Sequence, residues 1–552
     1  MEYRDWLGGN VERLRCALQF RHLFSACLLH VLCAGCATQI SAPTISHSEV
    51  VDGQPWRIHC ETAHSMQAPG EVPGVEGGRW IRGRDHAGEP VKLDGKLVDG
   101  FFELTNISAP ANGSVPLQRT ALRKLCIDTI DARQESEPLM LGWVMAAREY
   151  EDVEVPIAYP GRVDSGRVSR VVIFGDSLTD SGKLKRRLLV FPDRPYWLGR
   201  FSNGPVWPEY LAMATDLSVQ NNSYGGASVI YLEQLPGAGI VSHVREYGQM
   251  FVSGTIDLQI NDYLDKSLNG QDIARPLETL FIIWGGANDY ISKEPVSGLI
   301  TTFLNSPEGE TGYRAVAEQT VAGLAEHVRT LYQAGGRRFL LLNLPDLGHS
   351  PIVLQNTTYT PELANTHDED ARRLELAHRL TELTIYHNER LKQTLHKLLQ
   401  ELPDSEIVLL DAFDDFSRLT GTVENSAGFS YGYDYSTNEE VLTSEGKGLR
   451  LLRPCYSGSY LGTRDPGEIC ESPETAVFWD VVHPTTLTHC WQAFSVGKAM
   501  HKAGWLGALP EEPDYLNWCR AIVEKVTFGF QNWYIVERGI EPSLPEANKQ
   551  PD

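Results

Sequence analysis

Four short segments of the chain carry side chains of the types that break ester bonds. They are residues 175–178 (Gly-Asp-Ser-Leu), 221–227 (Asn-Asn-Ser-Tyr-Gly-Gly-Ala), 286–289 (Gly-Ala-Asn-Asp) and 480–484 (Asp-Val-Val-His-Pro). Cleavage of an ester needs a nucleophile, a general base, a group that orients the base, and hydrogen-bond donors for the developing oxyanion. The four segments together contain a candidate for each of these roles.

Ser177, His483 and Asp480 are the candidates for nucleophile, base and orienting acid. Ser177 follows a predicted strand, so we expect its hydroxyl at the exposed edge of a sheet. His483 would take the proton of that hydroxyl, while Asp480 would accept from the other imidazole nitrogen and stabilise the imidazolium. Pro484 lies where a helix is expected to begin, which would stiffen the chain behind the histidine. His349 also follows a predicted strand, but we interpret it as a polar loop residue.

The part of the chain that carries these segments alternates apolar strands with helices. The strands lack polar alternation, which favours a parallel sheet covered by helices on both faces. In such sheets ligands bind beyond the carboxyl ends of the strands, where most of the candidate residues fall. The predicted strands are residues 171–174, 280–284, 339–342 and 407–410, and the predicted helices are residues 313–333, 361–400 and 485–500.

The order of the four segments and their places on the predicted elements resemble the GDSL (SGNH) family of lipases and esterases. Each motif alone is common, but all four in this order are specific. The resemblance implies an α/β class, namely the SGNH-hydrolase three-layer fold with a parallel sheet, and a reaction through an acyl-serine. It also implies that the backbone N–H groups of Ser177 and Gly226 and the side-chain amide of Asn288 form an oxyanion hole. No cofactor is implied.

Further segments resemble particular branches of that family. Residues 201–207 and 344–348 are similar to bacterial secreted phospholipases and acyltransferases, and residues 56–60 and 125–129 to the accessory domain of thermolabile (lecithin-dependent) haemolysins. This implies a phospholipid or lysophospholipid substrate at a membrane surface, with cholesterol as a candidate acyl acceptor. A carbohydrate or short-chain esterase is the alternative with the same chemistry. A non-catalytic lytic or adhesive binding protein is the alternative of another class.

Composition and turn signals divide the chain into parts. Residues 38–160 hold short β-like runs between Pro-Gly and Asn-Gly turns, which predicts a small β-rich accessory domain without a long helix. A linker with proline, glycine and serine follows. We then expect a GDSL/SGNH catalytic domain over residues 167–510 and a polar C-terminal extension over residues 511–552.

Residues 1–37 have the pattern of a signal segment. Arg13, Arg15 and Arg21 precede a mostly apolar run of about 12 residues, which is too short to cross a bilayer. Cleavage could follow a small-residue pattern at residues 35–37, or it could precede Cys36 as in bacterial lipoproteins. We therefore expect bacterial export, giving either a secreted protein or a lipid-anchored outer-membrane protein.

Six cysteines lie beyond the signal segment, and the sequence alone cannot choose among their pairings. Disulfides suit an exported protein. The segment enclosed by Cys455 and Cys470 ends shortly before Asp480, so it would be either a simple staple or a lid next to the candidate site. The pairings favoured by closeness in the chain are Cys60 with Cys126, Cys455 with Cys470, and Cys490 with Cys519.

The composition excludes several classes of protein. The 552 residues carry a formal net charge of −23, with a pI of about 5.2 and a mean hydropathy of −0.25. An acidic chain lacks the basic surface that releases counterions from phosphates, which argues against a nucleic-acid partner. The low mean hydropathy argues against a polytopic membrane protein, and 42% hydrophobic residues suffice for a large core.

Overall fold

The structure is a computed structural model of the chain. All described residues belong to one compact unit of the chain, Pro55–Asp552. The predicted signal segment and the predicted linker lie outside the described residues. The structure describes residues 55–64, 79–108, 117, 119–133, 139–148, 154–159, 167–188, 192–215, 217–229, 254–291, 309–355, 369–420, 433, 439–442, 448–460 and 467–527.

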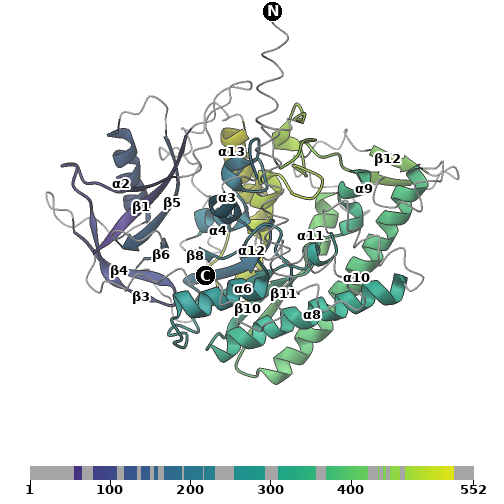
Figure 1. Ribbon diagram of the computed structural model, residues 1–552, viewed down its shortest axis with the longest axis horizontal. Coiled ribbons are helices and arrows are strands. Elements are labelled where there is room, and N and C mark those ends of the chain that lie inside the picture. Colours follow the sequence, from purple (N-terminus) through teal and green to yellow (C-terminus); the bar gives the residue numbers. More distant parts are fainter. Residues whose placement is uncertain are drawn as a thin grey trace, which may run out of the picture. The chain divides into compact units, whose positions relative to one another are not determined.

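A five-stranded parallel sheet lies at the centre of the part that carries the candidate site (Figure 1). Its order is β11-β10-β9-β7-β8. Every residue of β7, β9 and β10 is buried, as expected for parallel strands covered on both faces. The α/β class with a parallel sheet is thus confirmed, while β8, which is short and partly polar, is a strand that the sequence does not predict. The bounds are β7 (Arg170–Gly175), β8 (Ser218–Asn221), β9 (Thr279–Trp284), β10 (Arg338–Leu342) and β11 (Glu406–Leu410).

Successive residues of the strands point to opposite faces of this sheet, and two separate clusters of buried side chains result. Val172 and Phe281 belong to one cluster, whereas their neighbours Ile173 and Ile282 belong to the other. Helices complete each cluster, so the sheet is the middle of three layers (Figure 1). The helices of the first cluster are α6 (Ile256–Asp262), α8 (Gly309–Gln333) and α10 (Glu369–Glu401), and those of the second are α4 (Trp207–Ala214), α11 (Ala412–Leu419), α12 (Thr486–Lys502) and α13 (Glu512–Thr527).

A second sheet is formed by the preceding part of the chain. Its order is β2-β1-β3-β4-β6-β5, and an additional pairing of β1 with β5 closes β1, β3, β4, β6 and β5 into a ring. The strands are β1 (Trp56–His64), β2 (Arg79–Arg82), β3 (Lys92–Val98), β4 (Phe101–Ser108), β5 (Leu139–Arg148) and β6 (Val155–Ala158).

One helix, α2 (Arg119–Asp131), packs against this second sheet. Leu122 and Cys126 of α2 are fully buried, and the disulfide between Cys60 and Cys126 joins the helix to β1. The sequence predicts no long helix in this region, and the 13-residue α2 is an element that it does not predict. The buried positions recur at helical spacing, but charged and polar residues between them hide the pattern in the sequence.

Ion pairs join the second sheet to the parallel sheet and its loops. Glu103 on β4 pairs with Arg170 of β7, with 2.5 Å between Oε1 and Nη2. Glu61 on β1 lies 3.0 Å from Arg186 of α3 (Lys183–Leu188) and 3.9 Å from the fully buried Arg200. Both sheets thus belong to one compact unit, and a separate accessory domain stays a prediction.

The chain continues as a packed helix beyond residue 510. Tyr515, Trp518 and Ile522 of α13 are buried in the second cluster, and the disulfide between Cys490 and Cys519 ties α13 to α12. The predicted polar extension is therefore wrong for this helix, because its apolar residues recur at helical spacing among many charges. Residues 528–552 lie outside the described residues.

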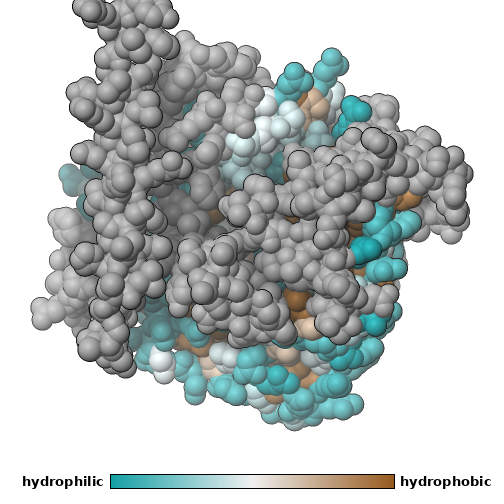
Figure 2. All heavy atoms as spheres, turned by 45° about the vertical axis from the view of Figure 1, so that its right-hand side comes forward, coloured by the Kyte–Doolittle hydropathy of each residue, from teal (hydrophilic) through white to brown (hydrophobic). Residues whose placement is uncertain are grey.

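One face of the described part is mainly hydrophilic where it is visible (Figure 2). Figure 2 shows one face, on which hydrophilic residues predominate and hydrophobic ones lie scattered between them. Among the described residues, none of the helices combines the length and the apolar character that a membrane span requires. The large hydrophobic side chains that are exposed in the described part lie on several elements and loops, and two of them, Ile385 and Leu399, lie on α10. The others are Leu97, Leu258, Leu277 and Ile469.

Candidate active site

Ser177 lies in the turn that directly follows β7. A Cβ at Gly175, the last residue of the strand, would lie 2.7 Å from the carbonyl oxygen of Trp284, so the close approach to β9 requires glycine. Asp176 organises the turn, because its Oδ1 accepts from the backbone N–H of Leu178 at 3.0 Å and its carbonyl oxygen accepts two further backbone N–H groups. The hydroxyl of Ser177 is therefore held at the carboxyl end of the sheet.

The structure brings Ser177 together with His483 and Asp480, although 306 residues separate the serine from the histidine. Nε2 of His483 lies 2.7 Å from Oγ of Ser177, and Nδ1 lies 2.7 Å from Oδ2 of Asp480. An ionised carboxylate can only accept, so Nδ1 carries the hydrogen. Nε2 of the neutral imidazole is then left to accept from the serine hydroxyl.

Asp480 accepts hydrogen bonds on both of its oxygens. Oδ1 accepts from the backbone N–H groups of Val482 and His483, each at 2.8 Å. Oδ2 accepts from the hydroxyl of Tyr196 at 2.7 Å, in addition to the imidazole. Burial, followed by the charge of Asp480, raises the pKa of Tyr196 well above its usual value, so this hydroxyl remains a donor. These donors stabilise the charge of a carboxylate that is only 3% exposed.

The chain on the far side of His483 is anchored by the segment at residues 202–210. The hydroxyl of Ser202 donates to the carbonyl oxygen of Pro484 at 2.9 Å, and Oδ1 of Asn203 accepts from the backbone N–H of Thr486 at 2.8 Å. The contact with Asn203 gives a hydrogen-bond partner to a backbone N–H in the first turn of α12 that has none within the helix. This block, which resembles the phospholipase branch, thus helps to position the histidine.

Aromatic side chains surround the imidazole of His483. The ring of Phe201 lies 4.9 Å from it and that of Tyr460 lies 5.8 Å from it, measured between centroids. Tyr196 packs edge to face against Tyr456 at 5.6 Å, and Tyr456 stacks on Trp479 at 5.5 Å. Such rings exclude water from the hydrogen bonds between aspartate, histidine and serine, which strengthens those bonds.

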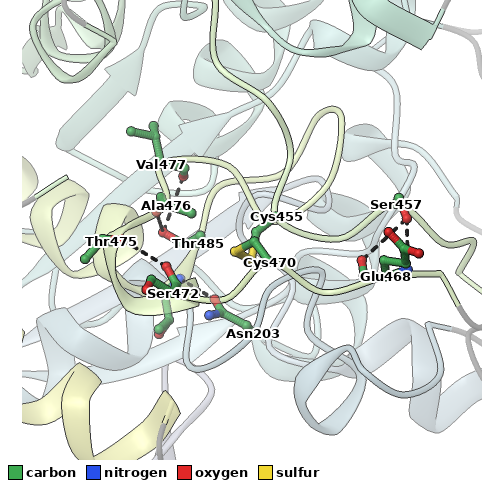
Figure 3. The surroundings of a disulfide bond; sticks show 11 residues. Asn203, Cys455, Ser457, Glu468, Cys470, Ser472, Thr475, Ala476, Val477 and Thr485 are labelled. Carbon is green, nitrogen blue, oxygen red and sulfur yellow. Dashed lines mark hydrogen bonds between the residues drawn. A yellow bond between two sulfur atoms is a disulfide. The ribbon is translucent and has the colours of Figure 1, made fainter. Parts of the chain in front are cut away.

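The disulfide between Cys455 and Cys470 holds the segment that supplies two of these rings (Figure 3). Backbone pairing extends beyond it, because Ser457 and Glu468 are hydrogen-bonded to each other. Cys455 also donates its backbone N–H to the carbonyl oxygen of Phe478 at 3.0 Å, close to Asp480. The loop is therefore attached to the strand-like segment that leads into Asp480. Residues 461–466 lie outside the described residues.

The two other predicted oxyanion donors lie in adjacent loops. Gly226 has a φ of 79°, a conformation that favours glycine. The side-chain amide of Asn288 donates to the carbonyl oxygen of Ala227 at 3.0 Å, which ties the two loops together and leaves its second N–H for another acceptor. Asn288 lines the same pocket as Ser177, whereas Gly226 is not among the described residues of its lining.

A pocket opens beside Ser177, and we call it the Ser177 pocket. Its walls come from the loops after β7, β9 and β10 and from α11, as expected at the carboxyl ends of parallel strands. His349 and Asp346 also line it, so interpreting His349 only as a polar loop residue misses its position. The apolar side chains of the lining are Leu178, Ala287, Ile291, Pro345, Leu347, Phe416, Phe478, Val482 and Pro484.

Sequence reasoning missed Tyr196, Phe201 and Tyr460, which contact the candidate residues. Phe201 belongs to a segment that the family resemblance points out, so a signal existed for it. Tyr460 lies between the two cysteines of a predicted disulfide, which is a weaker signal. Nothing near Tyr196 in the sequence indicates that its hydroxyl would reach Asp480.

Comparisons with known proteins show which family the chain resembles. A model of the GDSL-like lipase/acylhydrolase family matches residues 171–493. The phosphatidylcholine-sterol acyltransferase of Aeromonas hydrophila is 26% identical over 342 residues, which cover 58% of this chain and 87% of that protein. The thermolabile hemolysin of Vibrio parahaemolyticus is 24% identical over 400 residues, covering 72% and 78%. A GDSL esterase/lipase of Arabidopsis thaliana is 24% identical over 372 residues, covering 61% and 88%.

A parallel α/β sheet with this family match defines the class of the protein as a hydrolase. The family model covers more than half of the chain, and the chain belongs to the GDSL-like lipase/acylhydrolase family. The resemblance inferred from the four short segments is therefore confirmed.

Proposed function

We propose that this protein is a secreted serine hydrolase that cleaves acyl esters of phospholipids or lysophospholipids through an acyl-Ser177 intermediate. The observation that carries the proposal is the continuous series of contacts from Ser177 Oγ to His483 Nε2 and from His483 Nδ1 to Asp480 Oδ2, each 2.7 Å long. This arrangement is the one in which an imidazole can take the proton of a serine hydroxyl.

In the first half of the reaction, Ser177 attacks the carbonyl carbon of the ester. Its proton passes to Nε2 of His483, and Asp480 stabilises the imidazolium that forms. The negative charge that develops on the carbonyl oxygen would be met by the backbone N–H groups of Ser177 and Gly226 and by the amide of Asn288. When the tetrahedral intermediate collapses, His483 returns the proton to the departing alcohol and the acyl group stays on Ser177.

In the second half, His483 takes a proton from water, and the hydroxide attacks the acyl group. The bond between the acyl carbon and Oγ breaks, the fatty acid leaves, and the proton returns to Ser177. An alcohol in place of water would give a new ester by the same steps, and we propose cholesterol as such an acceptor.

The lining of the Ser177 pocket supports a lipid substrate. About half of its lining residues are apolar, which suits an acyl chain and helps to exclude water from the reacting groups. Two relatives are named as a phosphatidylcholine-sterol acyltransferase and a hemolysin, which favours lipids over sugar esters. The three disulfides of the described part support an oxidising compartment and hence secretion.

The proposal is tested with the purified full-length protein on phosphatidylcholine vesicles with and without cholesterol, measuring released fatty acid and sterol ester. p-Nitrophenyl acetate serves as the small-ester control, and Ser177→Ala serves as the background. We expect fatty acid release from vesicles that Ser177→Ala abolishes, with sterol ester appearing only when cholesterol is present.

Hydrolysis of the small ester without release from vesicles would reject the phospholipid substrate and leave a short-chain esterase. Activity of Ser177→Ala above about a tenth of the wild type would reject the nucleophile itself, since its loss removes the acyl-enzyme route.

A further inference from the structure

A second aspartate–histidine pair, Asp346 and His349, lines the Ser177 pocket. Nδ1 of His349 lies 2.6 Å from Oδ2 of Asp346, and the two residues have the same spacing in the chain as Asp480 and His483. A carboxylate can only accept, so Nδ1 again carries the hydrogen. In the neutral form of the imidazole, Nε2 is a hydrogen-bond acceptor.

The orientation of this pair is fixed by α10. Oδ1 of Asp346 accepts from the backbone N–H of Gly348 at 3.0 Å and from the hydroxyl of Thr381 at 2.7 Å. A Cβ at Gly348 would lie 2.1 Å from the carbonyl oxygen of Ala377, so the loop runs directly against the helix. His349 is therefore held in place by a supported aspartate, as binding residues with a fixed geometry are.

Nε2 of His349 is available to a ligand. The side chain keeps 22% of its exposure, and within the described part of the chain only Nδ1 of its ring forms a hydrogen bond. The turn does not need the imidazole, because Asp346 already caps it through Gly348. The ring therefore has no structural role in the turn, and it lies in the pocket that it lines together with Ser177.

The charge of the lining restricts what this nitrogen can bind. The described lining contains the carboxylates of Asp176 and Asp346 but no lysine or arginine. A phosphate group would find no cation to pair with there. A hydroxyl group, in contrast, is neutral and donates one hydrogen bond to the lone pair of Nε2.

We propose that His349 is a specificity-determining residue whose Nε2 accepts a hydrogen bond from a free aliphatic hydroxyl of the ligand in the Ser177 pocket. This inference rests on the proposed function, because the ligand enters as an ester or as an acyl acceptor. The hydroxyl has two sources: the alcohol part of a monoacyl substrate such as a lysophospholipid, or the second hydroxyl of an acceptor that carries two.

In the acceptor case, the hydroxyl that reacts and the hydroxyl that His349 binds are different groups. The reacting O–H gives its proton to Nε2 of His483 while its oxygen bonds to the acyl carbon. The bond from that carbon to Oγ of Ser177 then breaks, and the proton returns to the serine. His349 holds the neighbouring hydroxyl and exchanges no proton.

The test compares three variants of the full-length protein with the wild type. His349→Phe keeps a ring but removes both nitrogens, and His349→Gln keeps a polar group that can accept. His378→Phe is the matched control, because His378 is an exposed histidine of α10 and is not part of the described pocket lining. Circular dichroism and thermal melting confirm that each variant is folded.

Two assays distinguish the two sources of the hydroxyl. The first measures kcat/KM for lysophosphatidylcholine and for its analogue without the free hydroxyl, both below their critical micelle concentrations. The second measures how acyl groups from p-nitrophenyl butyrate partition to propane-1,2-diol and to 1-propanol. In each assay the readout is the ratio between the ligand with the free hydroxyl and the ligand without it.

We expect His349→Phe to lower one of these ratios about tenfold, as for the loss of one hydrogen bond, and to act mainly through KM in the first assay. His349→Gln should recover part of the ratio, and His378→Phe should match the wild type. A loss in the first assay assigns the hydroxyl to the substrate, and a loss in the second assigns it to the acceptor.

The proposal is overturned if both ratios stay at the wild-type value in folded His349→Phe, or if all ligands lose activity equally. A wild-type protein without any ester hydrolysis would overturn the proposed function as well. An active wild type with unchanged ratios in the variants overturns the role of His349 alone.

Discussion

The described part of the chain contains two aspartate–histidine pairs with the same spacing and the same internal hydrogen bond. In Asp480 and His483 the distance from Nδ1 to Oδ2 is 2.7 Å, and in Asp346 and His349 it is 2.6 Å. The surroundings differ. The ring of His483 is 1% exposed and its Nε2 contacts Ser177, whereas the side chain of His349 is 22% exposed and faces the pocket.

This difference shows that the spacing creates an oriented imidazole but does not determine its role. A carboxylate three residues earlier sets the tautomer in both pairs. Among the described residues, a serine hydroxyl is hydrogen-bonded to the imidazole only in the first pair, and aromatic rings lie against the imidazole only there. The second pair has an open nitrogen and is suited to binding. Four predictions examine this comparison.

The largest expected difference concerns the two histidines. His483→Ala should lower kcat/KM for p-nitrophenyl butyrate by about 10⁴-fold or more, because the serine loses its base. His349→Ala should change it less than about twofold, because p-nitrophenyl butyrate has no free hydroxyl that could donate to Nε2 of His349. Steady-state kinetics on folded variants measures both. Similar losses in the two variants would mean that both imidazoles take part in the chemistry.

Substitution of the two aspartates should affect activity as unequally as substitution of the two histidines. Asp480→Asn removes the charge that stabilises the imidazolium and permits the wrong tautomer, so we expect kcat to fall by up to about 10⁴-fold. Asp346→Asn should change kcat less than about tenfold and act on substrate preference. Pre-steady-state measurement of p-nitrophenol release gives the acylation rate. A near-normal Asp480→Asn protein would show that another group orients His483.

Each aspartate also accepts one side-chain hydroxyl, which allows a matched pair of deletions. Tyr196→Phe removes the donor to Oδ2 of Asp480, a buried charged acceptor, so we expect kcat/KM to fall about tenfold or more. Thr381→Val removes the donor to Asp346 and should lower the free energy of unfolding by about 1 kcal/mol, with little effect on kcat. Denaturant titration and kinetics on both variants separate these effects. An equal loss of kcat in both would contradict the comparison.

The smallest expected effect on activity concerns the contacts that hold each aspartate–histidine pair in place. The segment leading to Asp480 pairs with the disulfide loop, whereas Asp346 is anchored by α10. Cys455→Ser with Cys470→Ser should therefore lower the free energy of unfolding by up to about 3 kcal/mol, because the unfolded chain gains freedom. At 25 °C the folded fraction should keep its activity within about twofold. A large loss of activity in the folded double variant would show that the loop also shapes the site.

Several elements were predictable because their signals are local. β7, β9 and β10 are apolar at nearly every position. This pattern is typical of a strand whose two faces are both covered, because every side chain is then buried. α2 and α13 were not predictable in the same way, because charged residues lie between their buried residues in the sequence. The buried face of each helix becomes evident only from the side chains that it packs against in the fold. β8 is too short and polar to give a strand signal.

The sequence by itself determined the family and the candidate residues Ser177, Asp480 and His483. These follow from motif order and local spacing, which do not depend on distant contacts. Closeness in the chain only favoured one pairing of the six cysteines, and the structure contains that pairing. Only the tertiary structure decided that the hydroxyl of Tyr196 meets Asp480, 284 residues away, and that His349 lies in the same pocket as Ser177. Such contacts arise where strand ends converge, and no local pattern in the chain encodes which side chains meet there.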